Sequence, residues 1–281
     1  MNASMNDPGH RIHDPVPMAV LGVSGRMGRA LLLAMDEAGG IRLSGASASS
    51  DSRWVGMDAG AAAQGAARGV AVLADPASAI QGAAVAIDFT LPQATGANLD
   101  ACVAARCPLV IGTTGHASEI RDRIVRAADH IPLVMAPNMS VGVNLLLELV
   151  EQAARQLDER YDIEIFEAHH RDKKDAPSGT ALGLAAAAAA GRGVELEQVA
   201  EYGRHGLTGA RRPGNIGFSV FRGGDIVGEH TVSFAGIGER IELTHRASDR
   251  LAFARGAVRA ARWLIGRPSG LYSMRDVLGF R

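Results

Sequence analysis

The sequence predicts an α/β protein with two lobes: a doubly wound parallel sheet at the N-terminal end, then an α+β lobe with an open mixed sheet. Two observations predict this division. As far as residue 138, short apolar runs alternate with segments that can form helices, which is the pattern of βαβ units. After residue 138, glycine-bearing turns join runs of alternating polarity, as in sheets with antiparallel pairs. A length of 281 residues also suits two domains.

The first lobe contains six short apolar runs that we expect to be strands, because such runs are typical of parallel strands buried on both faces. They cover residues 18–22, 41–46, 70–74, 83–89, 109–112 and 133–136. Helices are expected at 25–38, 76–81 and 93–105. Right-handed crossovers between parallel strands would place such helices on both faces of the sheet.

The second lobe begins with an expected helix at 143–157 and an alternating strand at 161–166, followed by an alanine-rich helix at 181–190. Three further strands are expected at 217–222, 229–235 and 240–245. Because short turns join them, we expect them to be antiparallel neighbours. An amphipathic helix at 250–265 could return to the first lobe.

These elements predict the domain boundaries. Residues 1–16 are expected to be a flexible N-terminal extension. Residues 17–139, completed by 249–281, form the expected dinucleotide-binding domain. Residues 140–248 form the expected substrate-binding and oligomerisation domain. A hinge is expected at the two crossings between them, near 138–140 and 247–249.

Composition argues against several classes of protein. A net charge of -1 argues against nucleic acid as a partner, because proteins that follow phosphates carry a basic excess. The chain has no apolar run of membrane-spanning length and no signal peptide pattern at its start. Cys102 and Cys107 have the spacing of neither a metal site nor a disulfide framework, so we expect small buried side chains in a reducing compartment. We therefore expect a cytoplasmic protein.

A glycine-rich turn follows the first expected strand and opens the first helix. It reads GVSGRMG from Gly22 to Gly28. Glycines at the first turn between strand and helix let the backbone approach a pyrophosphate, which rests on the helix N-terminus. A purely structural tight turn is the alternative. This position in a parallel sheet favours a Rossmann-type dinucleotide-binding lobe.

Three later strand ends would lie at the same edge of the sheet. They read DFT at 88–90, GTTG at 112–115 and APNMS at 136–140. Ligands of open α/β sheets bind outside the carboxyl ends of the strands. Each segment alone could be an ordinary turn, but together they indicate a ligand-binding edge.

The densest group of titratable residues is the segment 167–180, EAHHRDKKDAPSGT, which we expect to be a loop before the alanine-rich helix. Asp175 is the expected N-cap, with Pro177 in the first turn. Ser178, Gly179 and Thr180 would then offer donors to an anion. Histidine and lysine beside an anion-binding helix end suit the reduction of an imine or carbonyl acid. A solvated loop is the alternative.

A metal is not expected in this segment. Adjacent histidines such as His169 and His170 rarely point at one ion, and no third ligand has a suitable spacing.

The segment 167–182, EAHHRDKKDAPSGTAL, closely resembles the signature loop of the 4-hydroxy-tetrahydrodipicolinate reductase family, also called the dihydrodipicolinate reductase family. The similarity runs from Val20 to the C-terminus. It includes the motifs GVSGRMG, DFT, IGTTG, APNMSVGVN, GDIVGEHTVSF and SGLYSMRDVL.

The resemblance implies NAD(P)H-dependent reduction of 4-hydroxy-tetrahydrodipicolinate, a small dicarboxylate, to tetrahydrodipicolinate in the diaminopimelate route to lysine. It implies that His169 is the general acid and proton shuttle and that Lys173 is a proton donor. His170, Gly179 and Thr180 would bind the substrate carboxylates. It also implies a homotetramer built on the open sheet. The implied cofactor-binding residues are Gly22, Val23, Ser24, Gly25, Arg26, Met27, Ser49, Gly112, Thr113, Thr114, Ala136, Pro137, Asn138 and Met139.

The sequence departs from the family at the end of the second strand. Members often have an acidic residue at the position of Ala48 and a basic residue at the position of Ser49. Without the acid, the 2′-phosphate of NADPH meets no repulsion, and Arg53 is the nearest cation. We therefore expect NADPH to be used at least as well as NADH.

Two other functions remain open on the residues alone. A non-catalytic dinucleotide sensor would have the first lobe without an acid–base cluster in the second. A dehydrogenase of a hydroxy acid or of homoserine would lack the His-His-x-x-Lys pattern before Ser-Gly-Thr.

Overall fold

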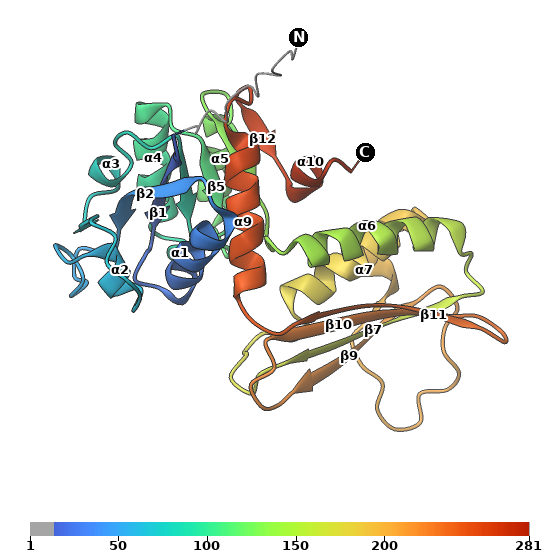
Figure 1. Cartoon of the computed structure of the whole chain (residues 1–281). Coiled ribbons are helices and arrows are strands. Elements are labelled where there is room, and N and C mark those ends of the chain that lie inside the picture. The colour runs from blue at the N-terminus through green and yellow to red at the C-terminus, as the bar shows by residue number, and fades with distance from the viewer. Residues whose placement is uncertain (1–13, 281) are drawn as a thin grey trace, which may run out of the picture.

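The computed structural model describes residues 14–280, which form two sheets with their helices, one per lobe (Figure 1). Most of the expected extension, residues 1–13, lies outside the described residues. Strand β1 begins at Val16, so the last residue assigned to the extension belongs to the sheet. In the described part of the chain, no helix is both long and apolar enough to cross a bilayer.

The first sheet has seven strands in the order β12-β6-β5-β4-β1-β2-β3, and every pair is parallel. This confirms the doubly wound, Rossmann-type sheet. Its strands are β1 (Val16–Leu21), β2 (Ile41–Ser47), β3 (Val72–Leu73), β4 (Val85–Asp88), β5 (Leu109–Ile111), β6 (Pro132–Met135) and β12 (Gly270–Tyr272). Its helices are α1 (Arg26–Ala38), α2 (Ala59–Ala62), α3 (Pro76–Ala79), α4 (Thr95–Ala105), α5 (Ser118–Ala127), α9 (Leu251–Leu264) and α10 (Met274–Leu278).

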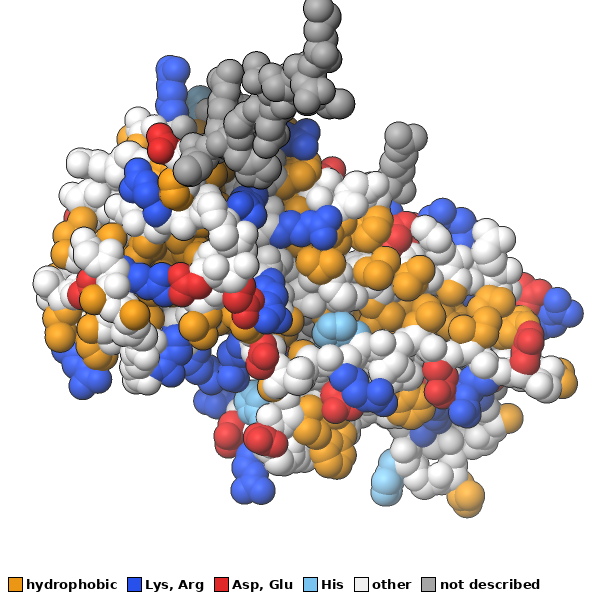
Figure 2. Space-filling view, in the orientation of Figure 1, with side chains coloured by type: hydrophobic (Ala, Val, Ile, Leu, Met, Phe, Trp, Pro, Cys, Tyr) orange, Lys and Arg blue, Asp and Glu red, His pale blue; other side chains and the backbone are white. Residues whose placement is uncertain are grey.

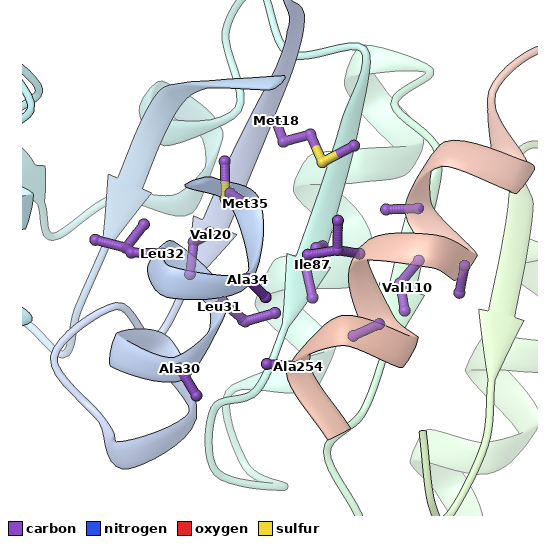
Figure 3. Packing of buried hydrophobic residues seen from close by; sticks show 14 of the residues in the cluster. Met18, Val20, Ala30, Leu31, Leu32, Ala34, Met35, Ile87, Val110 and Ala254 are labelled. Carbon is purple, nitrogen blue, oxygen red and sulfur yellow. The ribbon is translucent and has the colours of Figure 1, made fainter. Parts of the chain in front are cut away.

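Helices cover both faces of this sheet because its strands are apolar on both sides. Side chains from β1, β4 and β5 pack against α1 and α9 on one face (Figure 3). On that face, Leu31 of α1 and Ala254 of α9 lie over Val20 and Ile87 (Figure 3). The other face packs against α3, α4 and α5 and contains Cys102, one of the two buried free cysteines. The expectation for the cysteines as buried side chains is confirmed.

The second sheet is mixed and has the order β11-β10-β7-β9-β8. Its strands are β7 (Asp162–His169), β8 (Ala200–Glu201), β9 (Ile216–Arg222), β10 (Gly228–Ala235) and β11 (Arg240–Ala247), and its helices are α6 (Val141–Gln156), α7 (Gly179–Arg192) and α8 (Leu196–Val199). The expectation that β9 and β10 are neighbours is wrong, because β7 lies between them, parallel to β9 and antiparallel to β10. A short turn lets two successive strands run in opposite directions, but a third strand can still lie between them in the sheet.

One face of the second sheet is covered and the other is bare. Helices α6 and α7 pack on the inner face, over a core that includes Ile163, Ile165 and Phe234. Figure 1 shows no helix below the sheet. On that outer face, the side chains of Phe166 and Phe221 are 46% and 57% exposed. Figure 2 also shows hydrophobic side chains gathered over α6, where Leu145 and Leu149 are exposed.

After β11 the chain returns to the first lobe, as expected. Helix α9 packs beside α1, and β12 joins the sheet next to β6. Gly256 makes this return possible: a Cβ there would lie 1.7 Å from the carbonyl oxygen of Met139. The backbone of α9 therefore touches the segment where the chain leaves the first lobe.

Candidate active site

Strand β7 brings two titratable side chains to the inner face of the second sheet. Its alternation buries Ile163, Ile165, Glu167 and His169 in turn. The sequence predicts a strand that ends at residue 166 and a loop from 167, and this boundary is wrong. The strand continues to His169 because Ala168 pairs with Phe221 on β9 and with Glu229 on β10. Glu167 and His169 thus occupy fixed strand positions.

The carboxylate of Glu167 is at the centre of a buried network. Its Oε2 lies 2.5 Å from Nδ1 of His169, and its Oε1 accepts a hydrogen bond of 3.0 Å from the Ser178 N–H. The guanidinium of Arg222 donates to both oxygens, at 2.9 and 2.8 Å. Burial raises the pKa of Glu167, but the bonds from Arg222, His169 and Ser178 outweigh it, so the pKa lies below its usual value. Glu167 is therefore a buried anion.

Nδ1 of the His169 imidazole is hydrogen-bonded to Glu167, and Nε2 has no hydrogen-bond partner among the described residues. Gly228 on β10 faces Nε2, and a Cβ added to that glycine would lie 3.1 Å from it. Burial lowers the pKa of His169, and the nearby cations Lys173 and Arg222 lower it further, while Glu167 raises it. His230 packs edge-on against His169 with ring centroids 5.1 Å apart, and burial lowers its pKa to about 4.

Helix α7 begins at Gly179, with Ser178 as its N-cap. The Ser178 hydroxyl accepts from the Ala181 N–H and lies 3.1 Å from Nε2 of His230. The capping bonds use the N–H groups of Ser178 and Ala181, so those of Gly179 and Thr180 in the first turn take no part in them. N–H groups at a helix start, with the positive end of the helix dipole, are able to bind an anion.

The prediction that Asp175 caps this helix is wrong, and Pro177 lies before the first turn. Asp175 has other partners: its carboxylate lies 2.8 Å from the Lys173 ammonium, and its carbonyl accepts from Arg222. The bond from Lys173 lowers the pKa of Asp175. The N-cap lies three residues later than expected, at Ser178, whose N–H also bonds to Glu167.

Lys173 and His170 lie in the turn between β7 and α7. The Lys173 N–H donates to the His170 carbonyl, and the His170 N–H donates to the Ile226 carbonyl in the loop before β10. Both side chains are half-buried. The loop is thus tied to the connection between β9 and β10. Lys173 is close enough to His169 for its charge to affect that pKa.

The two lobes meet at the start of α7. Asn138, which follows β6, donates from Nδ2 to the Thr180 hydroxyl at 3.0 Å, and its Oδ1 accepts from the Ser140 N–H. A residue expected to contact cofactor therefore touches a residue expected to contact substrate. Ala136 and Met139, beside Asn138, are buried.

Two glycines of the turn lie where the backbone leaves no room for a side chain. A Cβ on Gly22, which has φ +85°, would lie 2.8 Å from the Phe89 carbonyl oxygen. A Cβ on Gly28 would lie 2.2 Å from the Val23 carbonyl oxygen. No side chain caps α1, so its first N–H groups are not satisfied in this way. Ser24, Gly25 and Arg26 line a cavity of about 660 Å³ whose lining also includes Val227 of the second lobe and Arg250.

The tips of β4 and β5 form one hydrogen-bonded unit. The buried carboxylate of Asp88 accepts from the Thr90 N–H and hydroxyl at 2.9 and 2.6 Å and from the Thr113 hydroxyl at 3.2 Å. A Cβ on Gly112 would lie 2.1 Å from the Phe89 ring. Thr113 is buried and holds the turn together, whereas Thr114 is exposed.

At the end of β2, Ala48 is buried and Ser49 is exposed. The Ser49 hydroxyl donates to the Asp51 carboxylate, whose pKa is lowered by that bond. The guanidinium of Arg53 lies 4.7 Å from the centroid of the Trp54 ring. No acidic side chain stands at position 48, and the nearest one is held by a serine.

Comparisons with known proteins identify the family of this chain. A family model described as "Dihydrodipicolinate reductase, N-terminus" matches residues 16–139, and one described as "Dihydrodipicolinate reductase, C-terminus" matches 142–278. This chain belongs to the dihydrodipicolinate reductase family. The family resemblance found in the sequence is thereby confirmed, and the chain is an oxidoreductase.

Individual relatives match over nearly the whole chain. The 4-hydroxy-tetrahydrodipicolinate reductase of Thiobacillus denitrificans is 58% identical, covering 95% of this chain and 99% of the relative. The enzyme of the same name from Nitrosomonas europaea is 52% identical, with the same coverage. A solved structure, the dipicolinate-bound dihydrodipicolinate reductase from Paenisporosarcina sp. TG-14, has the same fold. Its TM-score is 0.74 at 23% identity, over 93% of this chain and 98% of that chain.

Sequence reasoning missed three residues of this reductase site. Glu167 stands in the signature segment without an assigned role, and Arg222 and His230 lie on strands distant in sequence. One pattern could have found Glu167: the burial alternation of β7, continued for two more steps, places it on the same face as Ile165 and His169.

The Glu167 carboxylate already has a cationic partner, the guanidinium of Arg222. Ligand atoms of Glu167, His169 and His230 lie within 4.8 Å of one another. The Arg222 guanidinium, however, donates to both carboxylate oxygens of Glu167. It supplies the positive charge that a metal ion would otherwise supply at that carboxylate.

Proposed function

We propose that this reductase uses a nicotinamide dinucleotide to reduce 4-hydroxy-tetrahydrodipicolinate to tetrahydrodipicolinate, in the cytoplasm, as a step of the diaminopimelate route to lysine. The bond between Asn138 and Thr180 carries the proposal. It joins the ligand-binding edge of the first sheet to the anion-binding start of α7. A group held at one lobe can therefore react with a group held at the other.

The glycine turn suits the cofactor because its backbone can be approached closely. In this proposal, residues 22–27 hold the pyrophosphate, residues 112–114 and 136–139 line the nicotinamide and its ribose, and Ser49 lies beside the adenosine ribose. When bound, the reduced nicotinamide supplies the hydride. With no acid at position 48, we propose that NADPH serves at least as well as NADH.

The start of α7 suits a dicarboxylate. The N–H groups of Gly179 and Thr180 and the ring of His170 are proposed to hold its carboxylates. Hydrogen bonds to a charged group contribute about 1.5–3 kcal/mol each. The bond from Asn138 to Thr180 fixes this position relative to the first lobe.

His169 and Lys173 are proposed to supply the proton that accompanies the hydride. The bond to Glu167 places a proton on Nδ1 of His169, so a second proton is gained or lost at Nε2. Burial keeps the pKa of His169 low in the free protein. A dianionic substrate nearby would raise it, so His169 would take up a proton as substrate binds.

The wider organisation is also a proposal. The boundaries at 139/140 and 248/249 separate the elements of the two sheets. The bare outer face of the second sheet, with Phe166 and Phe221 exposed, supports association into a homotetramer. Mass measurement in solution would test this: a monomer would contradict it.

The function is tested by following NADPH absorbance with freshly prepared 4-hydroxy-tetrahydrodipicolinate. We expect oxidation that depends on this substrate and that pyridine-2,6-dicarboxylate inhibits in competition with it. Homoserine and 2-hydroxy acids serve as controls with NADP⁺ and are expected to be inert. Cofactor binding without any substrate-dependent turnover would favour a dinucleotide sensor instead.

A further inference from the structure

The geometry points to a further residue of the site: we propose that Glu167 is a positioning residue that fixes the proton donor and the dicarboxylate-binding helix start relative to each other. The inference deepens the proposed function and rests on it. Glu167 touches neither substrate nor cofactor in this scheme. It acts through His169 on one side and through Ser178 on the other.

The first half of the argument is the tautomer of His169. A carboxylate accepts hydrogen bonds and cannot donate them, so the ring nitrogen facing Glu167 Oε2 must carry a proton. The neutral ring therefore has its lone pair on Nε2, the atom that faces Gly228. Any further proton that His169 takes up goes to Nε2. A hydrogen bond from one ring nitrogen to a carboxylate commonly sets the tautomer and orientation of a functional histidine.

The second half is the position of α7. The other oxygen of Glu167 accepts from the N–H of Ser178, the N-cap residue. Gly179 and Thr180 follow directly, so the two proposed carboxylate-binding amides are attached to the residue that Glu167 holds. The Ser178 hydroxyl is itself held between Ala181 and His230. The start of the helix is thus bonded directly to the carboxylate.

The third element is Arg222, which keeps Glu167 ionised. Its guanidinium contacts both carboxylate oxygens and also the carbonyl oxygen of Asp175. It therefore links the carboxylate to the loop that carries Lys173. A bidentate pair of this kind is geometrically specific. Because Arg222 spans both oxygens, neither half of the arrangement can rotate without breaking a charged contact.

The charged and titratable groups around His169 come from every packed element. They are Glu167 on its own strand, Arg222 on β9, His230 on β10 and Lys173 in the loop. Only Glu167 favours the protonated ring, and both Lys173 and Arg222 oppose it. Removing the negative charge of Glu167 must therefore lower the pKa of His169, and activity that needs the protonated ring must be lost at a lower pH.

The experiment compares wild type with Glu167→Gln by steady-state kinetics over pH, and by calorimetry with pyridine-2,6-dicarboxylate in two buffers of different ionisation enthalpy. We expect kcat to fall by at least about 10²-fold, and the loss of activity with rising pH to begin at a lower pH. Proton uptake on binding dicarboxylate, measurable in wild type near neutral pH, should fall. NADPH affinity should not change.

Three further variants make the test specific. His169→Asn should abolish the proton uptake and so assign it to that ring. Glu164→Gln is a matched control, since Glu164 lies on the same strand and pairs with two arginines, Arg204 and Arg211, away from this network. If Glu167→Gln does not fold because Arg222 loses its partner, the double variant Glu167→Gln/Arg222→Gln restores the charge balance. Its pH profile should shift in the same direction but by less, because the loss of Arg222 partly offsets the loss of Glu167 at His169.

The outcomes separate the two proposals. If the dicarboxylate does not bind wild type, the proposed function fails and the role of Glu167 falls with it. If it binds wild type and Glu167→Gln with the same affinity and the same proton uptake, and kcat changes less than threefold, the positioning role alone is overturned. A loss confined to dicarboxylate affinity, with an unchanged pH profile, would also overturn it, because the link to His169 would be absent.

Discussion

The two ends of the candidate active site are built by different physical means. The glycine turn of the first lobe depends on missing atoms: Gly22 and Gly28 leave room where a Cβ would strike the backbone. The segment from Glu167 to Thr180 in the second lobe depends on charges held at fixed distances. The first end should therefore be sensitive to added carbon atoms and insensitive to pH. The second should tolerate small changes of volume but respond when a charge of the bonded network, such as Glu167 or Lys173, is removed.

The largest effect should come from the charged end. Lys173→Ala removes a proposed proton donor, and general acid catalysis contributes typically about 10²–10⁴-fold. We expect kcat to fall within that range and the dissociation constant for NADPH to stay constant, as measured by stopped-flow kinetics and fluorescence titration. The exposed neighbour Lys174 supplies the control, because Lys174→Ala should leave kcat unchanged. Near-normal turnover of Lys173→Ala would show that the role belongs elsewhere.

The next largest effect should come from the glycine turn of the first lobe. It should change stability and cofactor binding, and not the pH dependence of activity. Gly28→Ala places a Cβ 2.2 Å from the Val23 carbonyl oxygen, so the turn must move. Overpacking of this type typically costs about 1–3 kcal/mol. We expect a lower melting temperature and weaker NADPH binding with no shift of the pH profile. Gly203→Ala is the control, since nothing lies near its Cβ position. A pH shift in Gly28→Ala would contradict the division between the two ends.

A smaller effect is expected where the two ends meet. Thr180→Val keeps the shape of the side chain and removes the acceptor for Asn138 Nδ2. One hydrogen bond contributes about 0.5–1.5 kcal/mol, so KM for the dicarboxylate should rise up to about tenfold. The change in kcat should be smaller. An effect on NADPH affinity alone would assign Thr180 to the cofactor end instead.

The smallest effect concerns cofactor preference. Ala48→Glu adds a carboxylate that repels a 2′-phosphate and accepts from ribose hydroxyls. Ala48 is buried, but Ser49 beside it is exposed, and solvent weakens such contacts at that surface. We therefore expect a severalfold shift of kcat/KM toward NADH, weaker at high salt. A kcat/KM of the wild-type enzyme that is tenfold or more higher with NADH than with NADPH would contradict this explanation. Ribose recognition would then come from a residue other than those at the end of β2.

The two regions also differ in how well the sequence predicts them. In the first lobe, strands such as Val85–Asp88 are buried on both faces, so apolar runs mark them directly. The end of β7 escaped prediction because Glu167 and His169 are polar yet buried. Hydropathy cannot show that a charge is neutralised by Arg222, which is 55 residues away. Short-range patterns also failed for Asp175, whose partners lie outside the helix it was expected to cap.

The return of α9 and β12 to the first sheet has a consequence for how the chain folds during synthesis. The core of the first lobe contains Ala254, Val258 and Leu264 from α9, with Met274 and Val277 beyond it. These residues leave the ribosome only after the whole second lobe has been made. At about 5–20 residues per second, the wait is on the order of ten seconds. During that interval the part of this face that α9 will cover, over β4, β5 and β6, stays exposed beside α1. This is the surface on which a chaperone would act.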